Sequence, residues 1–281
     1  MAALAAAAVL AACAGLPPRV GMLGDPVALA ATPDGRLWGI DAASASVVVL
    51  QDGRMVDRLG GVGTGEEALL DPVDLDPTNG QTVFVADRAA GAIVQFTAEG
   101  RVSARTVVPD VDPAAPLRQT GRAEGRRGQP IAVAAAPDGS LYVLDAGRRH
   151  VLRLDPEGTV ERILGAGGLA EPVDLAVADD GGVWVADAGA GVVRHFDVYG
   201  AAQRDIRSDA AAGRIVGLSV LGSVVAVAQT RRLTVSDGDD VVVAPRDDAA
   251  GDLRAVAFVS RAHLALLTGA GIETWGDAVR D

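Results

Sequence analysis

The segment from Pro130 to Leu154 reads PIAVAAAPDGSLYVLDAGRRHVLRL, and its frame recurs along the chain. It holds three short apolar runs, and a Pro-Asp-Gly turn typical of a β-hairpin joins the first two. The same frame begins at Pro26, Pro72 and Pro172, and in every copy an Asp follows the proline by fifteen positions. The sequence therefore predicts a repeated unit built of strands.

The repeat predicts a β-propeller. Its four closing residues are Asp41, Asp87, Asp145 and Asp187. Short Asp side chains accept bonds from backbone N–H groups of the next turn, so we expect these residues to be turn caps. Two weaker copies end at Gln229 and Thr268, which makes six units. Each unit has three strand-like runs, and links such as GRMVDRLGG add a fourth, as in a blade of about 40 residues. We expect an all-β protein, a six-bladed β-propeller of four-stranded blades.

The ends of the chain suggest how the ring closes. The last unit ends with GIETWGD and leaves little chain for an outer strand, whereas RVGMLG, residues 19–24, precedes the first unit without a partner. We expect these two segments to meet in one blade, so that an N-terminal strand closes the ring.

The frame PxxLAxxPDGxLYVxDA and the Gly-rich linker GGVGTGEEALLDP, from Gly60 to Pro72, resemble NHL-repeat propellers. The resemblance covers residues 25 to 205, although GRRHV and GAGVV stand where the Asn-His-Leu positions of that family would lie. Six-bladed relatives include peptidyl amidating lyases, gluconolactonase-like hydrolases and strictosidine synthase-like proteins. Their chemistry depends on metal-ligating His or acidic residues. The resemblance thus implies a propeller, and leaves both a binding protein and an enzyme open.

Charge narrows the possible partners. The chain of 281 residues has a formal net charge of −12, and all 25 of its basic residues are Arg. Nucleic-acid backbones and anionic lipid surfaces require basic stripes, so we expect neither as a partner.

Cys13, the single cysteine, follows the apolar run MAALAAAAVLAA. The run is too short to span a bilayer, and Leu-Ala-Ala-Cys at residues 10–13 resembles the lipobox of bacterial lipoproteins. That resemblance implies cleavage before Cys13 and acylation of its sulfur. The alternative is an Ala-rich terminus with a buried free cysteine. We expect residues 1–12 to be a lipoprotein-type signal peptide, residues 13–24 the lipidated N-terminus and closing strand, and residues 25–281 the propeller.

Candidate chemical groups are few. His150, His195 and His263 fall in three different units at no metal-ligand spacing, so we expect strand residues rather than ligands. Asp74 and Asp174 occupy the same place, PVDL, in two inner strands. There they could bind Ca²⁺ or act as acid and base, or alternatively bond backbone groups of neighbouring blades. No catalytic set and no cofactor follows from the residues themselves.

An insertion interrupts the repeat. The repeat prolines are spaced by 46, 58 and 42 residues, so the second interval is longer than its neighbours. The extra segment is Pro-rich and then basic, and its arginines are Arg118, Arg122, Arg126 and Arg127. Arg pairs well with carboxylate and phosphate, which makes the segment a candidate anchor for an acidic partner. A solvated loop that offsets nearby acids is the alternative.

These observations predict a lipid-anchored propeller of a bacterial cell envelope, facing the periplasm, that acts as a non-catalytic scaffold. We expect it to bind an envelope protein or acidic ligand and to touch the membrane through its lipid alone. The alternative is a propeller enzyme, a lyase or lactonase-like hydrolase, with a metal at the central channel.

Overall fold

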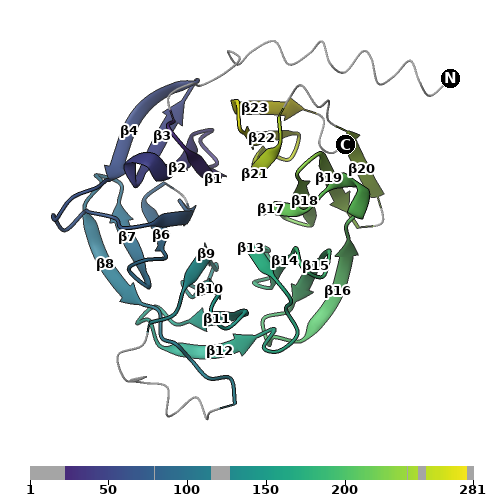
Figure 1. The fold of residues 1–281 in the computed structure, drawn as a ribbon, viewed down its shortest axis with the longest axis horizontal. Helices are drawn as coiled ribbons and strands as arrows, with labels where there is room; N and C mark the ends of the chain where they lie inside the picture. Colours follow the sequence, from purple (N-terminus) through teal and green to yellow (C-terminus); the bar gives the residue numbers. More distant parts are fainter. Residues whose placement is uncertain (1–22, 79, 115–126, 239, 246–250, 277–281) are drawn as a thin grey trace.

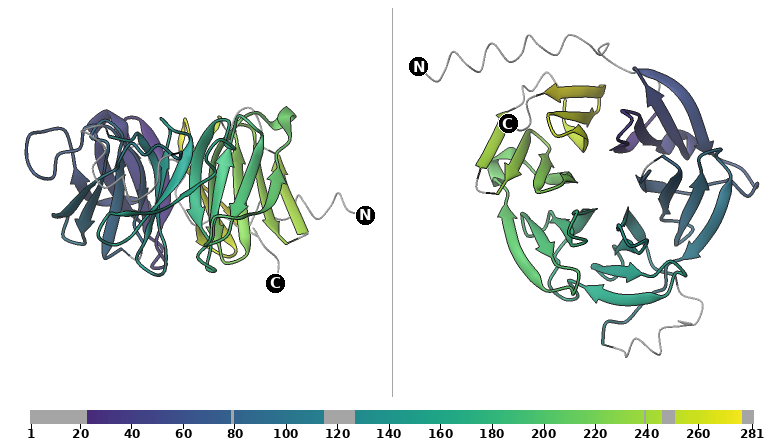
Figure 2. Two further views of the ribbon diagram at one scale, coloured as in Figure 1. Left: turned by 90° about the horizontal axis from the view of Figure 1, so that it is seen from below. Right: turned by 180° about the vertical axis from the view of Figure 1, so that it is seen from behind.

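The computed structural model describes residues 23–78, 80–114, 127–238, 240–245 and 251–276. Its strands form six antiparallel sheets that stand as blades around an open centre, in the order of the chain (Figure 1). Seen from the side, the blades make a thick disc (Figure 2). The predicted all-β, six-bladed propeller is confirmed.

The strands follow the predicted units. Blade 1 contains β1 (Pro26–Ala31), β2 (Leu37–Asp41), β3 (Ser46–Gln51) and β4 (Arg54–Gly60). Blade 2 contains β5 (Pro72–Asp76), β6 (Thr82–Asp87), β7 (Ala92–Thr97) and β8 (Val102–Val107). Blade 3 contains β9 (Pro130–Ala135), β10 (Leu141–Asp145), β11 (His150–Leu154) and β12 (Val160–Leu164). Blade 4 contains β13 (Pro172–Val177), β14 (Val183–Asp187), β15 (Val192–Phe196) and β16 (Ala202–Arg207).

The two units with weak frames also form blades. Blade 5 contains β17 (Ile215–Leu221), β18 (Val224–Gln229), β19 (Arg232–Asp237) and β20 (Asp240–Pro245). Blade 6 contains β21 (Leu253–Ser260), β22 (His263–Thr268) and β23 (Gly271–Gly276), three strands in the described part of the chain. The described 3-10 helices are η1 (Ala42–Ser44) and η3 (Ala210–Ala212). The closing strand expected at residues 19–24 lies mostly outside the described residues.

Each blade begins at the centre and ends at the rim. The first strand of every unit, from β1 to β21, lies innermost, and in the first five blades the fourth lies outermost (Figure 1). Inner strands such as PIAVAA carry small side chains, which fit where the blades crowd together. The glycines of the Pro-Asp-Gly hairpins take the positive φ that these turns require, 84° at Gly35 and 86° at Gly139.

The core lies between blades rather than within them. Trp38 and Ile40 of blade 1, for example, pack with Val85 and Phe96 of blade 2 in one buried cluster. A similar cluster joins blade 1 to blade 6, and Leu23 packs against it. Because each cluster takes side chains from two neighbours, the blades stabilise one another around the ring.

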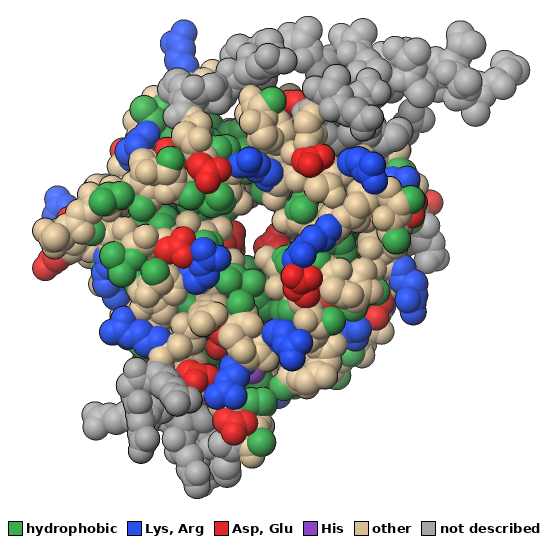
Figure 3. Space-filling view, in the orientation of Figure 1, with side chains coloured by type: hydrophobic (Ala, Val, Ile, Leu, Met, Phe, Trp, Pro, Cys, Tyr) green, Lys and Arg blue, Asp and Glu red, His purple; other side chains and the backbone are tan. Residues whose placement is uncertain are grey.

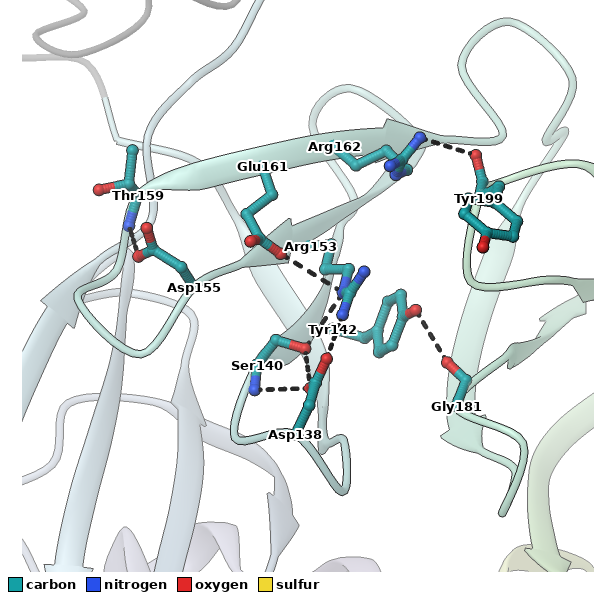
Figure 4. A network of polar contacts seen from close by, with 10 residues as sticks. All are labelled: Asp138, Ser140, Tyr142, Arg153, Asp155, Thr159, Glu161, Arg162, Gly181 and Tyr199. Carbon is teal, nitrogen blue, oxygen red and sulfur yellow. Dashed lines mark hydrogen bonds and ion pairs between the residues drawn. The ribbon is translucent and has the colours of Figure 1, made fainter.

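Polar contacts add to this packing between blades 3 and 4 (Figure 4). The Tyr142 hydroxyl donates to the Gly181 carbonyl at 3.0 Å, and Arg162 Nη1 donates to the Tyr199 carbonyl at 2.9 Å. Arg153 lies over the Tyr142 ring and holds it in place. The first bond joins β10 to the turn between β13 and β14, and the second joins the outermost strand β12 to the turn between β15 and β16.

The closing aspartates are turn caps, as predicted. Asp87 accepts from the backbone N–H groups of Leu70, Asp71 and Ala90 at 2.9, 3.0 and 3.2 Å. Asp187 repeats this set of bonds in blade 4. Each aspartate thus ties the entrance of its own blade to the turn after its second strand.

Candidate functional site

The centre of the ring is hollow. The six inner strands enclose a cavity of about 350 Å³. Most of the residues that line it are apolar, but polar atoms make up the larger part of its exposed wall, and acidic side chains show at the central opening (Figure 3). A cavity of this volume is large enough for a small ligand, so the channel is the first candidate site.

Asp74 in β5 and Asp174 in β13 both line this channel, as their shared PVDL place predicts. Each follows a β-bulge at the start of its strand. Asp74 Oδ2 accepts from the Val133 N–H of blade 3 at 2.9 Å, and Asp174 Oδ2 accepts from the Leu218 N–H of blade 5 at 2.7 Å. The carboxylates therefore link neighbouring blades, which was the alternative that their position left open.

Two further inner-strand residues also accept an N–H group of the next blade, and they were not predicted from the sequence. Asp76 Oδ2 accepts from the Ala135 N–H at 2.7 Å, and Ser219 Oγ accepts from the Phe258 N–H at 3.1 Å. The signal for Asp76 was its place two positions after Asp74, because alternate strand residues share a face. Inner-strand N–H groups point toward the channel and have no strand partner there, so polar side chains of the preceding blade satisfy them.

The channel raises the pKa values of its carboxyl groups. Burial raises the pKa of Asp174 to about 7, although bonds from the Leu218 and Leu175 N–H groups oppose the shift. Burial and then the nearby Asp174 carboxylate raise the pKa of Asp74 well above its usual range. Burial also raises the pKa of Asp76. Near neutral pH the Asp174 carboxyl group is therefore present in both its protonated and its charged form.

One basic side chain lines the channel among the described residues. Arg254 in β21 donates from Nη1 to the Pro26 carbonyl at 3.1 Å and pairs with Asp25 at 3.0 Å. Its charge is held at the junction of blades 6 and 1, where it helps to close the ring.

The histidines do not converge. His150 is buried at the start of β11, and His195 stacks on Trp184 with 4.5 Å between ring centroids. His263 Nδ1 lies 3.2 Å from the Ser260 hydroxyl in blade 6. Within the residues that the structure describes, no three His, Cys, Asp or Glu side chains lie close enough together to hold a metal ion.

The insertion starts from a well-packed base between β8 and β9. Val108 and Val111 are buried, and Pro109 forms an isolated β-bridge with Arg127. Asp110 pairs with Arg148 of blade 3 at 2.6 Å. Both ends of the insertion are thus fixed where blades 2 and 3 meet.

Arg127, one of the four candidate arginines, belongs to that base. Its backbone forms the bridge, and its exposed side chain donates from Nη1 to the Ala90 carbonyl at 2.7 Å. Arg118, Arg122 and Arg126 lie outside the described residues, as does Cys13. None of the helices in the described residues has the length and apolar character to cross a membrane.

Comparison with known proteins supports the fold. No family model and no curated protein matches the chain. Among solved structures it is similar to streptogramin B lyase, with a TM-score of 0.62 at 11% identity over 91% of this chain and 83% of that one. It is also similar to virginiamycin B lyase from Staphylococcus aureus, in a catalytically inactive form with quinupristin and in a selenomethionine form. The TM-score is 0.60 for both, at 12% and 13% identity, over 91% of this chain and 85% of each. At such identity the likeness shows the fold alone.

Proposed function

We propose that this propeller is a lipid-anchored scaffold of the bacterial cell envelope, facing the periplasm. It binds an envelope protein or other acidic ligand without catalysis, and the insertion between β8 and β9 is the contact region. The NHL-like frame and the lipobox-like Leu-Ala-Ala-Cys13 are part of this proposal.

The observation that carries the proposal is the base of the insertion. The ring does not need a segment of this length, since blades 1 and 3 connect to their successors through shorter links. Yet its ends are held by a β-bridge, an ion pair and two buried valines. A loop on a rigid framework is a common location for recognition.

The channel carboxylates favour a structural role in this proposal. Asp74, Asp76 and Asp174 each accept an N–H of the next blade, so they complete the inner surface of the ring. Ca²⁺ prefers six to eight oxygen ligands. Since these carboxylates already serve backbone donors, the proposal includes no cofactor, and metal analysis of the purified protein tests that prediction.

Affinity purification from native membranes after crosslinking tests the scaffold. The test variant changes Arg118, Arg122 and Arg126 to Ala and keeps Arg127, because its bond to Ala90 supports the base of the insertion. A specific partner that is retained by the native protein and lost by the variant supports the proposal.

A matched control removes equal charge elsewhere. Arg54, Arg58 and Arg101 are exposed, and their change to Ala tests whether charge alone explains the loss. Absence of any partner from the native protein, or equal loss in both variants, contradicts the contact region that we propose.

A propeller enzyme is the second candidate, and the Asp174 pKa of about 7 favours it. A carboxyl group that titrates near neutral pH in a ligand-sized cavity suits general acid–base chemistry. Lyase and lactonase assays test this candidate, and it requires activity that is lost in Asp174→Asn.

A further inference from the structure

Asp145 differs from the other closing aspartates. Asp87 and Asp187 use both carboxylate oxygens for backbone N–H groups. Asp145 Oδ1 accepts from Gln129 at 3.1 Å and from Gly147 at 2.9 Å. Its Oδ2 is buried and has no hydrogen-bond partner in the described structure. Burial of an unsatisfied carboxylate oxygen is costly, so this departure requires an explanation.

The insertion explains why Asp145 Oδ2 has no N–H donor. In blades 2 and 4, the N–H two positions before the proline, at Leu70 and Ala170, reaches the second oxygen. The equivalent residue of blade 3 is Gly128, and its N–H donates instead to the Val108 carbonyl at 2.8 Å. Gly128 directly follows the bridge between Pro109 and Arg127. The base of the insertion therefore takes the donor that Asp145 would otherwise use.

A histidine faces the oxygen that is left over. His150 is paired with Asp145 across β10 and β11, a place held by Ser46, Ala92 and Val192 in blades 1, 2 and 4. Its side chain is 0% exposed, and Nε2 lies 3.9 Å from Asp145 Oδ2. Neither ring nitrogen has a hydrogen-bond partner within the described residues. Two unsatisfied buried groups thus face each other beside the insertion.

The surroundings favour the neutral ring. Burial lowers the pKa of His150, and Arg148 lowers it further, whereas Asp145 and Asp110 raise it. Asp145 comes from β10, Arg148 from the turn before β11 and Asp110 from the insertion. Since Arg148 and Asp110 pair with each other at 2.6 Å, Asp145 is the principal partner for a charged ring.

We propose that His150 and Asp145 form an acid-sensitive latch beneath the base of the insertion, through which protonation regulates partner binding. The evidence for the latch is the geometry of His150 and Asp145, whereas the regulation of partner binding rests on the proposed function. Protonation gives the ring two N–H donors, and Asp145 Oδ2 can accept one of them. The other has no acceptor in the described surroundings, so the charged ring is better satisfied in water. Acid therefore favours a loosened state in which Gln129 and Gly147 lose their bonds to Asp145.

Hydrogen exchange of the full chain tests the latch without a partner. We expect the protection of the Gln129 amide, corrected for the pH dependence of intrinsic exchange, to fall about tenfold between about pH 7.5 and 5.5. In His150→Val, which copies Val192 of blade 4, the fall should be less than about twofold, because the imidazole that the latch requires is absent. The amide of Glu171, which bonds to Asp187, is an internal control.

Side-chain nitrogen NMR gives a second measurement. The signals that disappear in His150→Val identify the ring, and its midpoint should lie below that of an exposed histidine. A midpoint in the ordinary range, or an equal loss of Gln129 protection in the native protein and the variant, overturns the latch.

Partner capture separates the two proposals. Capture that weakens in acid with the native protein, but not with His150→Val, supports regulation. Equal capture at both pH values overturns the regulation of partner binding by protonation. The latch itself is then tested by the hydrogen-exchange data alone. If no partner is captured at either pH, the proposed function fails and the regulation fails with it.

Discussion

Replacement of Asp174 by Asn should stabilise the protein above neutral pH and have little effect in acid. The carboxyl has an ordinary pKa of 3.8 and a pKa of about 7 in the folded protein. A pKa that folding raises means that the folded state holds its proton more tightly than the unfolded chain. The native protein therefore loses stability as the pH rises from 3.8 to about 7, and the loss is complete above that.

The magnitude follows from the same two pKa values. At about 1.4 kcal/mol per pH unit, the loss is at most about 4 kcal/mol. Asn can still accept the Leu218 N–H, but its amide group cannot accept the Leu175 N–H, which bonds to Asp174 Oδ1 at 2.8 Å. That lost bond costs about 1 kcal/mol. We expect a net gain of about 1 to 3 kcal/mol in the free energy of unfolding at about pH 8, and a loss of up to about 1 kcal/mol at about pH 4.

Urea unfolding followed by tryptophan fluorescence measures this difference. Asp205→Asn on the exposed strand β16 is the matched control, and its effect should be small at every pH. The reasoning is refuted if Asp174→Asn is less stable than the native protein at about pH 8, or if its effect does not change with pH.

Three further changes test other parts of the structure. Asp187→Ala leaves three buried or partly buried N–H groups without an acceptor and should cost about 2 to 4 kcal/mol in urea unfolding; a cost below about 0.5 kcal/mol contradicts its role as a cap. Tyr142→Phe removes only the bond to Gly181 and should cost about 1 kcal/mol, whereas no change would show that packing alone joins blades 3 and 4 there. Cys13→Ser should release the protein from membranes in cell fractionation, and unchanged retention contradicts the lipid anchor.

The fold could be predicted because its determinants are local and repeated. A proline that opens a strand, a glycine in the hairpin and an aspartate at fixed spacing specify each blade. The closing aspartates needed no tertiary information, since their partners lie at the entrance of the same blade. Blades 5 and 6 were harder to recognise, because Gln229 and Thr268 replace the aspartate. Gln229 still donates to the carbonyls of Asp209 and Gly213 at 2.8 and 2.7 Å, so a different side chain ties the same entrance.

The site could be predicted only in part, because its properties arise between blades. The sequence placed Asp74 and Asp174 in equivalent inner strands and left two roles open. It could not show that the Asp174 carboxylate raises the pKa of Asp74, since the two residues are far apart in the chain and interact electrostatically only in the folded ring. The His150 environment was hidden for a similar reason. It depends on the insertion redirecting Gly128, a contact that no periodic pattern encodes.

Residues that depart from the repeat are explained by the stability of the ring in the channel, but not in blade 3. The channel carboxylates replace small residues, yet each satisfies an inner-strand N–H, so the stability of the ring accounts for them. In blade 3, the insertion diverts Gly128 and a buried histidine faces the unsatisfied Asp145. In blades 2 and 4 the closing aspartate caps the same turn by accepting three backbone N–H groups, with no insertion and no buried histidine beside it. Stability therefore does not account for the departure in blade 3, since the simpler arrangement satisfies every group. The base of the insertion is where a function of this chain should be sought first, and the buried pair of His150 and Asp145 makes the pH dependence of that function the measurement to begin with.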